Sequence, residues 1–469
     1  MSGFGAWRVE LGTCLIAALL YLAPLLLDAP LTDPDEGLHA AISQEMVERG
    51  DLVVPRFLGR AFLDKPILFF WAQAASIRVL GMNTAAARLA GTLFALLGIA
   101  TTGWLARTLL DRRIGWVAAA CYATMVLPFL MAQAPVHDIA LVPFTNVAFV
   151  FLWRAGRDSG FGMRDSLLAG VVLGLSILTK GLEGVAIVGV GYGAYLLFTR
   201  ALTWRLVAQG ALVVAIAVLI ALPWYLAMNA REPGYLRYYL VDRHLLGFAT
   251  ATQEHHGQPW WYYVPLVVGG GLPWIVLIGL ARRKGAPYTA LWTWLGTALV
   301  LLTMSQSKAV TYILPAMPAI AILAAASAVA ARTRLVIGVA STAIYSVALV
   351  TFGPSVARLH SARDLAAYFN ASGRVPATIF VFDQRVSFVY YLRPELRRQL
   401  RDDHVRSVSV EELAAMRPFP HDAVVTVPAD LAAERLPRIP QLANARRDVA
   451  GRYLVVTPAS GRSSADQTP

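Results

Sequence analysis

Eleven stretches of this 469-residue chain contain no Asp, Glu, Lys or Arg. They are residues 11–27, 89–106, 114–131, 139–153, 166–179, 184–199, 206–229, 262–281, 286–305, 309–331 and 335–357. Most reach the roughly 20 residues that a helix needs to cross a membrane, and flanking residues complete the shorter ones. Only 15% of the residues are charged, against about a quarter in soluble domains. We therefore predict an all-α polytopic membrane protein with about eleven transmembrane helices and additional interfacial helices.

Basic residues in alternate loops set the expected orientation. Short loops rich in Lys and Arg stay on the cytoplasmic side, and with the N-terminus inside, the basic loops are those at 107–113, 154–165, 200–205, 282–284 and 332–334. The net charge of +12 then reflects topology, and we expect no nucleic-acid partner. The first apolar stretch lacks a small-residue cleavage site, so we interpret it as an anchor.

The opposite, outer face receives residues 28–88, residues 230–261 and the tail from about 358. Residues 1–357 are expected to form the transmembrane domain and 358–458 a small α/β domain, with a helix at 362–369 and strands at 378–382, 422–427 and 453–456. The polar residues 459–469 are expected to be disordered. Candidate catalytic groups are therefore sought on the outer face.

The first outer loop begins with an acidic run. Asp33 is typical of an N-cap, with Glu36 as its capping-box partner, and a helix that ends at Gly50 is expected to lie in the membrane interface. A second interfacial helix is expected over 66–77. Asp35 has no capping duty. It is a candidate catalytic carboxylate, and solvated surface is the alternative.

A second carboxylate and three lysines occur at predicted outer ends of spans. Asp138, the second candidate catalytic residue, borders the span at 139–153, where an ionisable group marks a functional site or serves as an N-cap. Lys65, Lys180 and Lys308 either snorkel to lipid headgroups or form a cluster of cations around a phosphate.

The second outer loop contains two adjacent histidines after Glu254. Adjacent side chains rarely bind the same ion, and the His255-His256 pair lacks the spacing of a dedicated zinc motif. A metal site would need a distant partner such as Asp64 or Glu36.

Together, these motifs resemble a known family. The order is Pro34-Asp35-Glu36, Val54-Pro55, Asp64-Lys65-Pro66, Asp138, Thr179-Lys180-Gly181, Arg231-Glu232-Pro233, His256 before Pro259-Trp260-Trp261-Tyr262-Tyr263, Leu272-Pro273-Trp274, and Lys308 before Thr311-Tyr312-Ile313-Leu314-Pro315. Over residues 30–330 it resembles the bacterial aminoarabinose transferases that modify lipid A. Those are GT-C-type membrane glycosyltransferases, as are the protein O-mannosyltransferases.

The resemblance implies a transferase that uses a polyprenyl-phosphate sugar donor and no nucleotide cofactor. It implies that Asp35 lies at the reaction centre, that Asp138 matches a second acidic position and that Lys65 contacts the carrier phosphate. Asp64 and His256 match ligands of a divalent metal, zinc. The remaining candidates for substrate binding are Glu36, Arg56, Lys180, Lys308 and Tyr312.

Three positions depart from the pattern of the resembled family. Asp64 stands where that family usually has Glu, which shortens the reach toward a metal. Gly247-Phe248 replaces an Arg-Phe pair and removes a cation that could help to hold a phosphate. Ala309-Val310 replaces Leu-Pro.

The sequence therefore predicts an integral-membrane glycosyltransferase of the bacterial inner membrane, with its site facing the periplasm. The acceptor is expected to be lipid A, lipopolysaccharide or another envelope glycan, and the oligomeric state stays open. The alternative is a transporter or flippase of an anionic polyprenyl-linked lipid. Absence of an internal repeat and of mid-membrane charges favours the enzyme. The enzyme requires Asp35, Lys65, Asp138 and His256 to converge on one pocket.

Overall fold

The computed structural model describes residues 12, 15–16, 18–133, 136–158, 161–250, 257–281, 284–401, 403–420 and 422–458. The chain forms two compact units. The first, here called the helical unit, comprises Met1–Leu27, Asp51–Val54 and Phe62–Val350. The second, the α/β unit, comprises Asp28–Gly50, Pro55–Ala61 and Thr351–Pro469. The first outer loop is thus divided between the two units.

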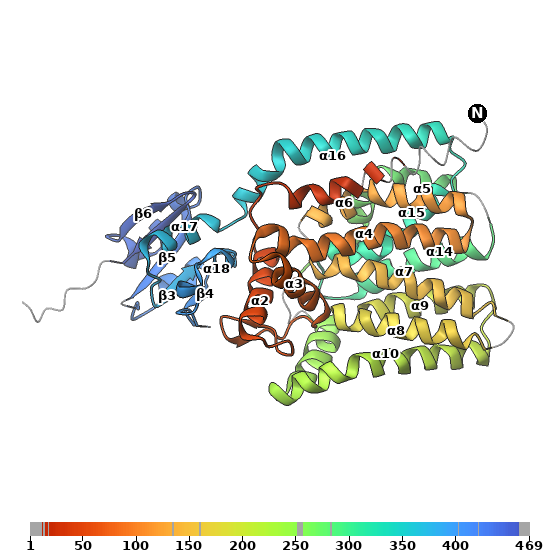
Figure 1. Ribbon diagram of the computed structural model, residues 1–469, viewed down its shortest axis with the longest axis horizontal. Coiled ribbons are helices and arrows are strands. Elements are labelled where there is room, and N and C mark those ends of the chain that lie inside the picture. The colour runs from red at the N-terminus through yellow and green to blue at the C-terminus, as the bar shows by residue number, and fades with distance from the viewer. Residues whose placement is uncertain are drawn as a thin grey trace, which may run out of the picture. The chain divides into compact units, whose positions relative to one another are not determined.

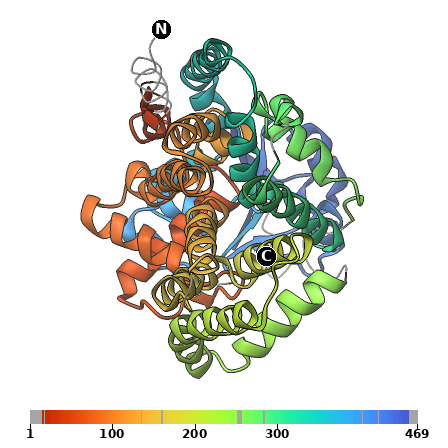
Figure 2. The same cartoon turned by 90° about the vertical axis from the view of Figure 1, so that its right-hand side faces the viewer.

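The helical unit consists of helices that run side by side (Figure 1) and are seen nearly end-on in Figure 2. Its described elements are η1 (Ala23–Leu25), α3 (Leu68–Leu80), α4 (Thr84–Leu109), α5 (Arg112–Ala123), α6 (Val126–Gln133), α7 (His137–Ala155), α8 (Met163–Lys180), α9 (Glu183–Phe198), α10 (Trp204–Arg231), α11 (Tyr235–Arg237), the π-helix η2 (Tyr238–Leu246), α12 (Gly247–Ala249), α13 (Tyr263–Gly270), η3 (Trp274–Leu280), α14 (Ala286–Met304), η4 (Val310–Ala316) and α15 (Met317–Ala325). The long helix α16 (Ala331–Leu359) runs from this unit into the α/β unit.

Four of the described helices, α4, α7, α10 and α16, are each long and apolar enough to cross a membrane. The number rises to six if α5 with α6 and α13 with η3 each count as one bent span, with bends of 59° and 97°. The chain is therefore a mostly helical, multi-pass membrane protein. The helix expected over 66–77 is present as α3.

Small residues and buried polar contacts hold the helices together. Gly170 and Gly174 of α8 face Ile216 and Ile220 of α10 so closely that an added Cβ would lie 2.6 Å from each isoleucine Cβ. In α7, the Asn146 amide donates to hydroxyls of α4 at 3.1 and 3.2 Å. Small residues at four-residue spacing and interhelical hydrogen bonds are the contacts expected between helices in lipid. They fix the bundle that carries the site.

The α/β unit contains a five-stranded mixed sheet in the order β4-β3-β5-β7-β6, with β3 parallel to β4 and β5, and β7 antiparallel to β5 and β6. Its elements are α2 (Asp35–Arg49), β1 (Arg56–Phe57), β2 (Arg60–Ala61), α17 (Arg363–Ser372), β3 (Thr378–Val381), α18 (Phe388–Tyr391), α19 (Pro394–Arg397), β4 (Val405–Ser407), α20 (Val410–Ala415), β5 (Ala423–Pro428), α21 (Ala432–Arg435), η5 (Leu436–Arg438), η6 (Pro440–Leu442), β6 (Arg446–Ala450) and β7 (Tyr453–Thr457). The expected helix and three strands are confirmed as α17, β3, β5 and β7. The tail 459–469 lies outside the described residues.

The core of the α/β unit lies against its sheet. Buried side chains of alternate strand positions meet those of α20 and the turns after β5; among them are Phe380, Leu413, Val425, Val427 and Val456. Val425 and Val456 are opposite one another in the pairing of β5 with β7. Apolar residues that recur every second position bury one face of a sheet.

Helix α2 differs from its prediction in two ways. It spans Asp35–Arg49, and Gly50 at its C-cap has a positive φ of 66°. Most of its residues are buried, and it packs on α18 within the α/β unit. It therefore does not present to the membrane interface the apolar face that the sequence predicted. Asp33 does not cap it. Glu36 Oε2 instead accepts from the backbone N–H and hydroxyl of Thr32, at 2.8 and 3.0 Å.

Asp33 is bonded to a distant part of the chain. Its carboxylate accepts from the backbone N–H groups of Val386 (2.8 Å), Ser387 (2.6 Å) and Ala362 (3.1 Å), and from the Ser387 hydroxyl (2.7 Å). Gly37 follows one turn later, and a Cβ there would lie 2.6 Å from Ser387 Cα. These contacts fix the first turn of α2, which carries Asp35, to the α/β unit.

Candidate functional site

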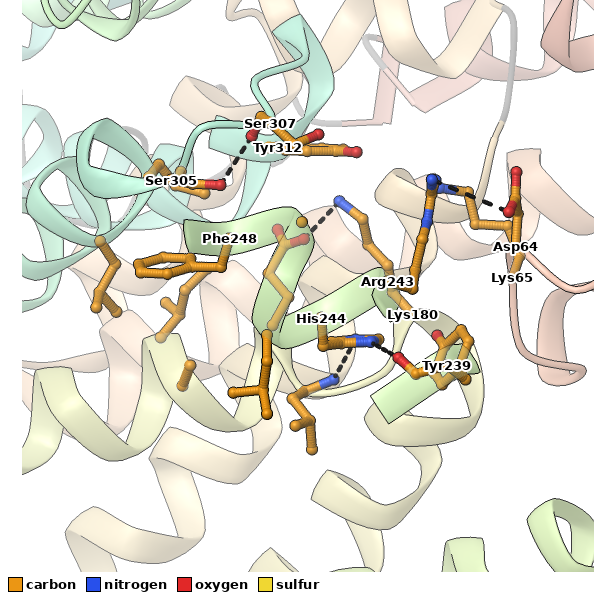
Figure 3. A pocket seen from close by; sticks show the side chains of 18 residues that line it. Asp64, Lys65, Lys180, Tyr239, Arg243, His244, Phe248, Ser305, Ser307 and Tyr312 are labelled. Atoms are coloured by element: carbon orange, nitrogen blue, oxygen red, sulfur yellow. Dashed lines mark hydrogen bonds and ion pairs between the residues drawn. The ribbon is translucent and has the colours of Figure 1, made fainter. Parts of the chain in front are cut away.

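A cavity of about 300 Å³ lies within the helical unit. Its charged and polar side chains come from the loop before α3, the end of α8, the start of α9, η2, η4 and the segment before η4. They include Asp64, Lys65, Lys180, Glu183, Arg243 and Tyr312. Apolar walls are formed by side chains such as Ile187, Leu245, Phe248, Leu301 and Leu302. In Figure 3, Asp64 and Lys65 lie at one end and Phe248 at the other. The cavity therefore suits a ligand with a charged head and an apolar chain.

Lys180 is the most strongly held cation of the cavity. It is the last residue of α8, and its side chain is 5% exposed. Its ammonium forms an ion pair with Asp138 of α7 and a second with Glu183 of α9, whose Oε2 lies 2.7 Å away. The ammonium also lies 3.8 Å from the centroid of the Tyr312 ring. Buried charges need such compensation, and it fixes where Lys180 meets the cavity.

Asp138 does not itself line the cavity. It is 6% exposed and directed at Lys180, in the first turn of α7. A carboxylate committed to a buried ammonium is poorly placed to accept a proton from a substrate. The catalytic role expected of Asp138 stays a prediction, and the contact that the structure shows is its ion pair with Lys180.

Gly181 explains why the Thr-Lys-Gly motif ends in glycine. It has a positive φ of 79°, and a Cβ there would collide with the His244 ring and lie 2.8 Å from Tyr239 Oη. The Leu182 N–H donates to His244 Nε2 at 3.4 Å, so Nδ1 carries the proton and donates to Tyr239 O at 2.7 Å. Figure 3 shows the second bond. Gly181 thus lets η2 pack on the end of α8 and form one wall.

Arg243, on η2, supplies a cation that the sequence analysis did not identify. Its Nη1 lies 3.9 Å from Asp64 Oδ1, which also accepts from Tyr238 Oη at 2.6 Å; Figure 3 shows the Arg243–Asp64 pair. Arg243 lies four residues before Gly247, the position at which the resembled family has an arginine. A guanidinium is thus present in the cavity despite that loss.

The other two lysines differ in position. Lys65 lines the cavity, is half-buried and forms no ion pair with a described residue. Lys308 is 4% exposed and donates to the backbone carbonyl of Ser305; it does not line the cavity, although Ser305 and Ser307 do. Of the predicted cations, Lys65 and Lys180 therefore face the ligand space directly.

The remaining predicted residues of the first outer loop belong to the α/β unit. Asp35 is exposed in the first turn of α2. Glu36 is buried against Thr32, and Arg56 Nη1 donates to Gly59 O at 3.1 Å within the β1–β2 hairpin. Asp35 is the carboxylate among them that is open to a substrate.

The predicted metal site is only half within the described residues. His256 lies outside them, and among the residues that are described no three His, Cys, Asp or Glu side chains gather as metal ligands. Asp64 instead has a phenol and a guanidinium beside it. A hydroxyl donor and a guanidinium at this carboxylate do not fit a metal cation at Asp64.

Glu183, Arg243 and His244 are among the cavity residues that the sequence analysis missed. Burial lowers the pKa of His244, so its neutral form is favoured. For Arg243 and His244, the available signal was the polar run Asp242-Arg243-His244 inside a largely aromatic and apolar segment. Glu183 carried a weaker signal, as a carboxylate at the start of an apolar stretch.

Comparisons with known proteins give matches in sequence and in fold. Residues 64–226 match the family model described as dolichyl-phosphate-mannose-protein mannosyltransferase. An undecaprenyl phosphate-α-4-amino-4-deoxy-L-arabinose arabinosyl transferase of Aeromonas hydrophila is 35% identical over 319 residues, 66% of this chain and 58% of that protein. A Pseudomonas aeruginosa protein with the same name is 35% identical over 317 residues, 65% of this chain and 57% of the relative. The chain thus spans less than two thirds of these relatives.

Solved structures share the fold over nearly the whole chain. ArnT of Cupriavidus metallidurans bound to undecaprenyl phosphate has a TM-score of 0.75 and 21% identity, and the match covers 95% of this chain and 97% of that one. The oligosaccharyltransferase of Archaeoglobus fulgidus in its apo form has a TM-score of 0.57 and 13% identity, covering 99% and 76%. The chain thus shares the fold of ArnT, and about two thirds of its sequence is similar to the aminoarabinose transferases.

Proposed function

We propose that this protein is an integral-membrane glycosyltransferase that moves a sugar from a polyprenyl-phosphate carrier to lipid A, lipopolysaccharide or another envelope acceptor. One observation carries the proposal: the cavity joins Lys65, Lys180 and Arg243 to an apolar wall that includes Phe248 and Leu302. A polyprenyl phosphate has the same division, with an anionic phosphate at the end of a long hydrocarbon. Charge-assisted hydrogen bonds from lysine and arginine are the usual way to bind a phosphate.

The donor end of the reaction follows from these cations. The bond between the sugar C1 and the carrier phosphate oxygen breaks, and its electron pair stays on the departing polyprenyl phosphate. Lys65 and Arg243 stabilise that growing negative charge at fixed positions. Two carboxylates neutralise Lys180, so its N–H groups orient the phosphate but add little net positive charge.

The acceptor end requires a base. A new bond forms between an acceptor oxygen and the sugar C1, and the proton of that oxygen is taken up by Asp35. Asp138 acts through Lys180, which it holds in place. Glu36 and Arg56 shape the segment around Asp35, and Lys308 orders the Ser305–Ser307 turn that lines the cavity.

The topology is part of the proposal. The eleven apolar stretches are proposed to span the bacterial inner membrane, including the shorter described helices α8, α9 and α15. The basic loops then face the cytoplasm, while Lys65, Lys180 and the 358–458 domain face the periplasm. A site on that face takes a lipid-linked sugar and needs no soluble nucleotide donor.

The names of the relatives supply the first donor to test, undecaprenyl-phosphate-linked 4-amino-4-deoxy-L-arabinose. The purified protein in nanodiscs is incubated with this donor and lipid A, and the lipid is analysed by mass spectrometry. A mass increment of one aminopentose in the wild type, absent with Asp35→Asn, is the expected result. If intact donor and a panel of envelope acceptors give no increment, the proposed activity is wrong.

A further inference from the structure

The α/β unit contains a second cavity, lined by charges that the proposed reaction does not use. It has a volume of about 310 Å³ and lies entirely within that unit. Four arginines line it, Arg49, Arg397, Arg398 and Arg401, together with two carboxylates, Glu45 and Glu48. The lining therefore carries a surplus of positive charge.

Both carboxylates of this cavity are already occupied. Glu45 Oε1 accepts from Arg49 Nε at 2.6 Å and from the Gly59 N–H at 2.9 Å. Glu48 is bound by Arg397 through two nitrogens, with Nε at 3.2 Å. Each glutamate neutralises one arginine, so neither is available to Arg398 or Arg401.

Arg398 and Arg401 therefore provide the surplus charge. Both are exposed on the turn after α19, three residues apart, and neither forms an ion pair with a described residue. Arg401 Nη1 donates to the carbonyls of Arg398 (2.8 Å) and Leu400 (3.1 Å), which holds its guanidinium at the cavity. The other N–H groups of Arg401 are left for a ligand, in the fork geometry that matches a phosphate.

The cavity also has apolar walls. Ala41 of α2, Phe57 and Leu58 of the hairpin, and Val389 and Leu400 contribute to its lining. A free inorganic anion does not need such walls, whereas a phosphorylated sugar has apolar faces that pack on them. The lining therefore matches a phosphate attached to a sugar or to another partly apolar group.

We propose that this cavity binds a phosphate group of the acceptor glycolipid, at a distance from the reacting group. This rests on the proposed function only for the identity of the acceptor. Asp35 and Arg49 are the first and last residues of α2, and 1.5 Å per residue gives about 20 Å between them. Asp35 and the cavity would then engage two separate groups of one acceptor.

The test measures binding without a donor, so that it does not depend on transfer. The full chain in detergent is titrated with bisphosphorylated lipid A, with lipid A lacking one phosphate, and with phosphatidylglycerol. The cavity variant is Arg398→Ala/Arg401→Ala, two exposed substitutions that leave the Arg397–Glu48 pair intact. The matched control, Arg447→Ala/Arg452→Ala, removes the same charge from exposed positions of the same unit that do not line the cavity.

The cavity variant is expected to bind bisphosphorylated lipid A roughly tenfold more weakly than the wild type, because two charge-assisted contacts are lost. The control is expected to bind bisphosphorylated lipid A as the wild type does. For the lipid that lacks one phosphate, the wild type and the cavity variant are expected to have nearly equal affinities. Equal losses in both variants, or a cavity-specific loss for phosphatidylglycerol as well, would overturn the proposal.

The outcome separates this inference from the proposed function. If the wild type binds bisphosphorylated lipid A and the cavity variant does not, but no sugar is transferred, the inference stands and the proposed activity fails. If sugar is transferred with the same apparent affinity for acceptor in both variants, the activity stands and the inference fails.

Discussion

The ammonium of Lys180 and the carboxylate of Asp138 form a buried ion pair between the end of α8 and the start of α7, 42 residues apart in sequence. Glu183 forms a second ion pair with the same ammonium, at 2.7 Å. The pair joins two helices at the wall of the cavity. It also explains how a lysine can be kept charged and oriented at the border of an apolar region.

Asp138→Asn is expected to destabilise the helical unit, because it removes one of the two carboxylates that compensate a buried ammonium. Breaking a buried ion pair from one side costs about 3–5 kcal/mol. Thermal unfolding in detergent measures the loss. Lys180→Met should also be destabilising, because it leaves Asp138 and Glu183 buried without the ammonium that they share. A single variant as stable as the wild type would contradict the importance of the pair.

Asp35→Asn and Asp33→Asn are expected to separate chemistry from structure. Asp35→Asn removes the proposed base from an exposed position and should abolish transfer with no change in thermal stability. The Asp33 carboxylate accepts four hydrogen bonds, and in Asp33→Asn the amide NH2 group would face some of the same N–H and O–H donors. This should lower the free energy of unfolding by about 1–3 kcal/mol. It should lower the unfolding temperature of the α/β unit. Transfer by Asp35→Asn at the parent rate would exclude its role as the base.

The pH dependence of stability is expected to report on His244. Its pKa is lowered by burial in the folded protein, so the unfolded chain takes up the proton first as the pH falls. The contribution to stability is complete above the usual value of 6.5 and is lost as the pH falls below it. Unfolding temperatures between pH 7.5 and pH 5 should therefore fall more in the wild type than in His244→Gln. Parallel curves would contradict this assignment.

Gly181→Ala is expected to disrupt the wall formed by η2. The added Cβ would collide with His244 and come within 2.8 Å of Tyr239 Oη, at a backbone φ that favours glycine. We expect a loss of donor affinity with only a modest loss of stability, because the substitution displaces η2 and leaves the bundle core unchanged. Gly189→Ala, in α9 with no atom within 4 Å of the added Cβ, is the control. Similar donor affinity in both variants would show that this packing is unimportant for binding.

A zinc ion held by Asp64 and His256 remains a prediction of the resemblance. Metal content is measured by mass spectrometry on the purified wild type, Asp64→Asn and His256→Ala. The contacts of Asp64 with Tyr238 and Arg243 lead us to expect the same content in all three proteins. One equivalent of zinc in the wild type, lost in both variants, would show that the metal binds there.

Several charged and polar residues of the cavity could be predicted from the sequence, because membrane topology restricts the depth at which each residue lies. Lys65, Lys180 and Tyr312 lie at predicted outer ends of spans, and residues at one depth of a bundle need only short reaches to meet. Asp64 lines the same cavity because it is the residue directly before Lys65. Arg243 and His244 were not predicted, since η2 is a π-helix and the usual helical spacing does not give the direction of its side chains.

The α/β unit shows the opposite case. Its strands were evident from β-branched runs, but the inclusion of α2 depended on contacts between residues some 350 positions apart, such as Asp33 with Ser387 and Glu48 with Arg397. The local sequence pattern predicted that Asp33 caps the helix that follows it. No periodicity in either segment specifies such a pairing, so the two halves of the unit were predicted separately.

The central claim is that the cavity around Lys65 and Arg243 recognises the phosphate of a polyprenyl carrier. The most direct measurement compares the affinities of the purified protein for undecaprenyl phosphate and for undecaprenol. The wild type should prefer the phosphate, and Lys65→Ala/Arg243→Ala should bind undecaprenyl phosphate at least about 100-fold more weakly, since each charge-assisted contact contributes about 1.5–3 kcal/mol. Unchanged binding of undecaprenol would show that the apolar wall is intact. Equal affinity of both proteins for the phosphate would contradict the account.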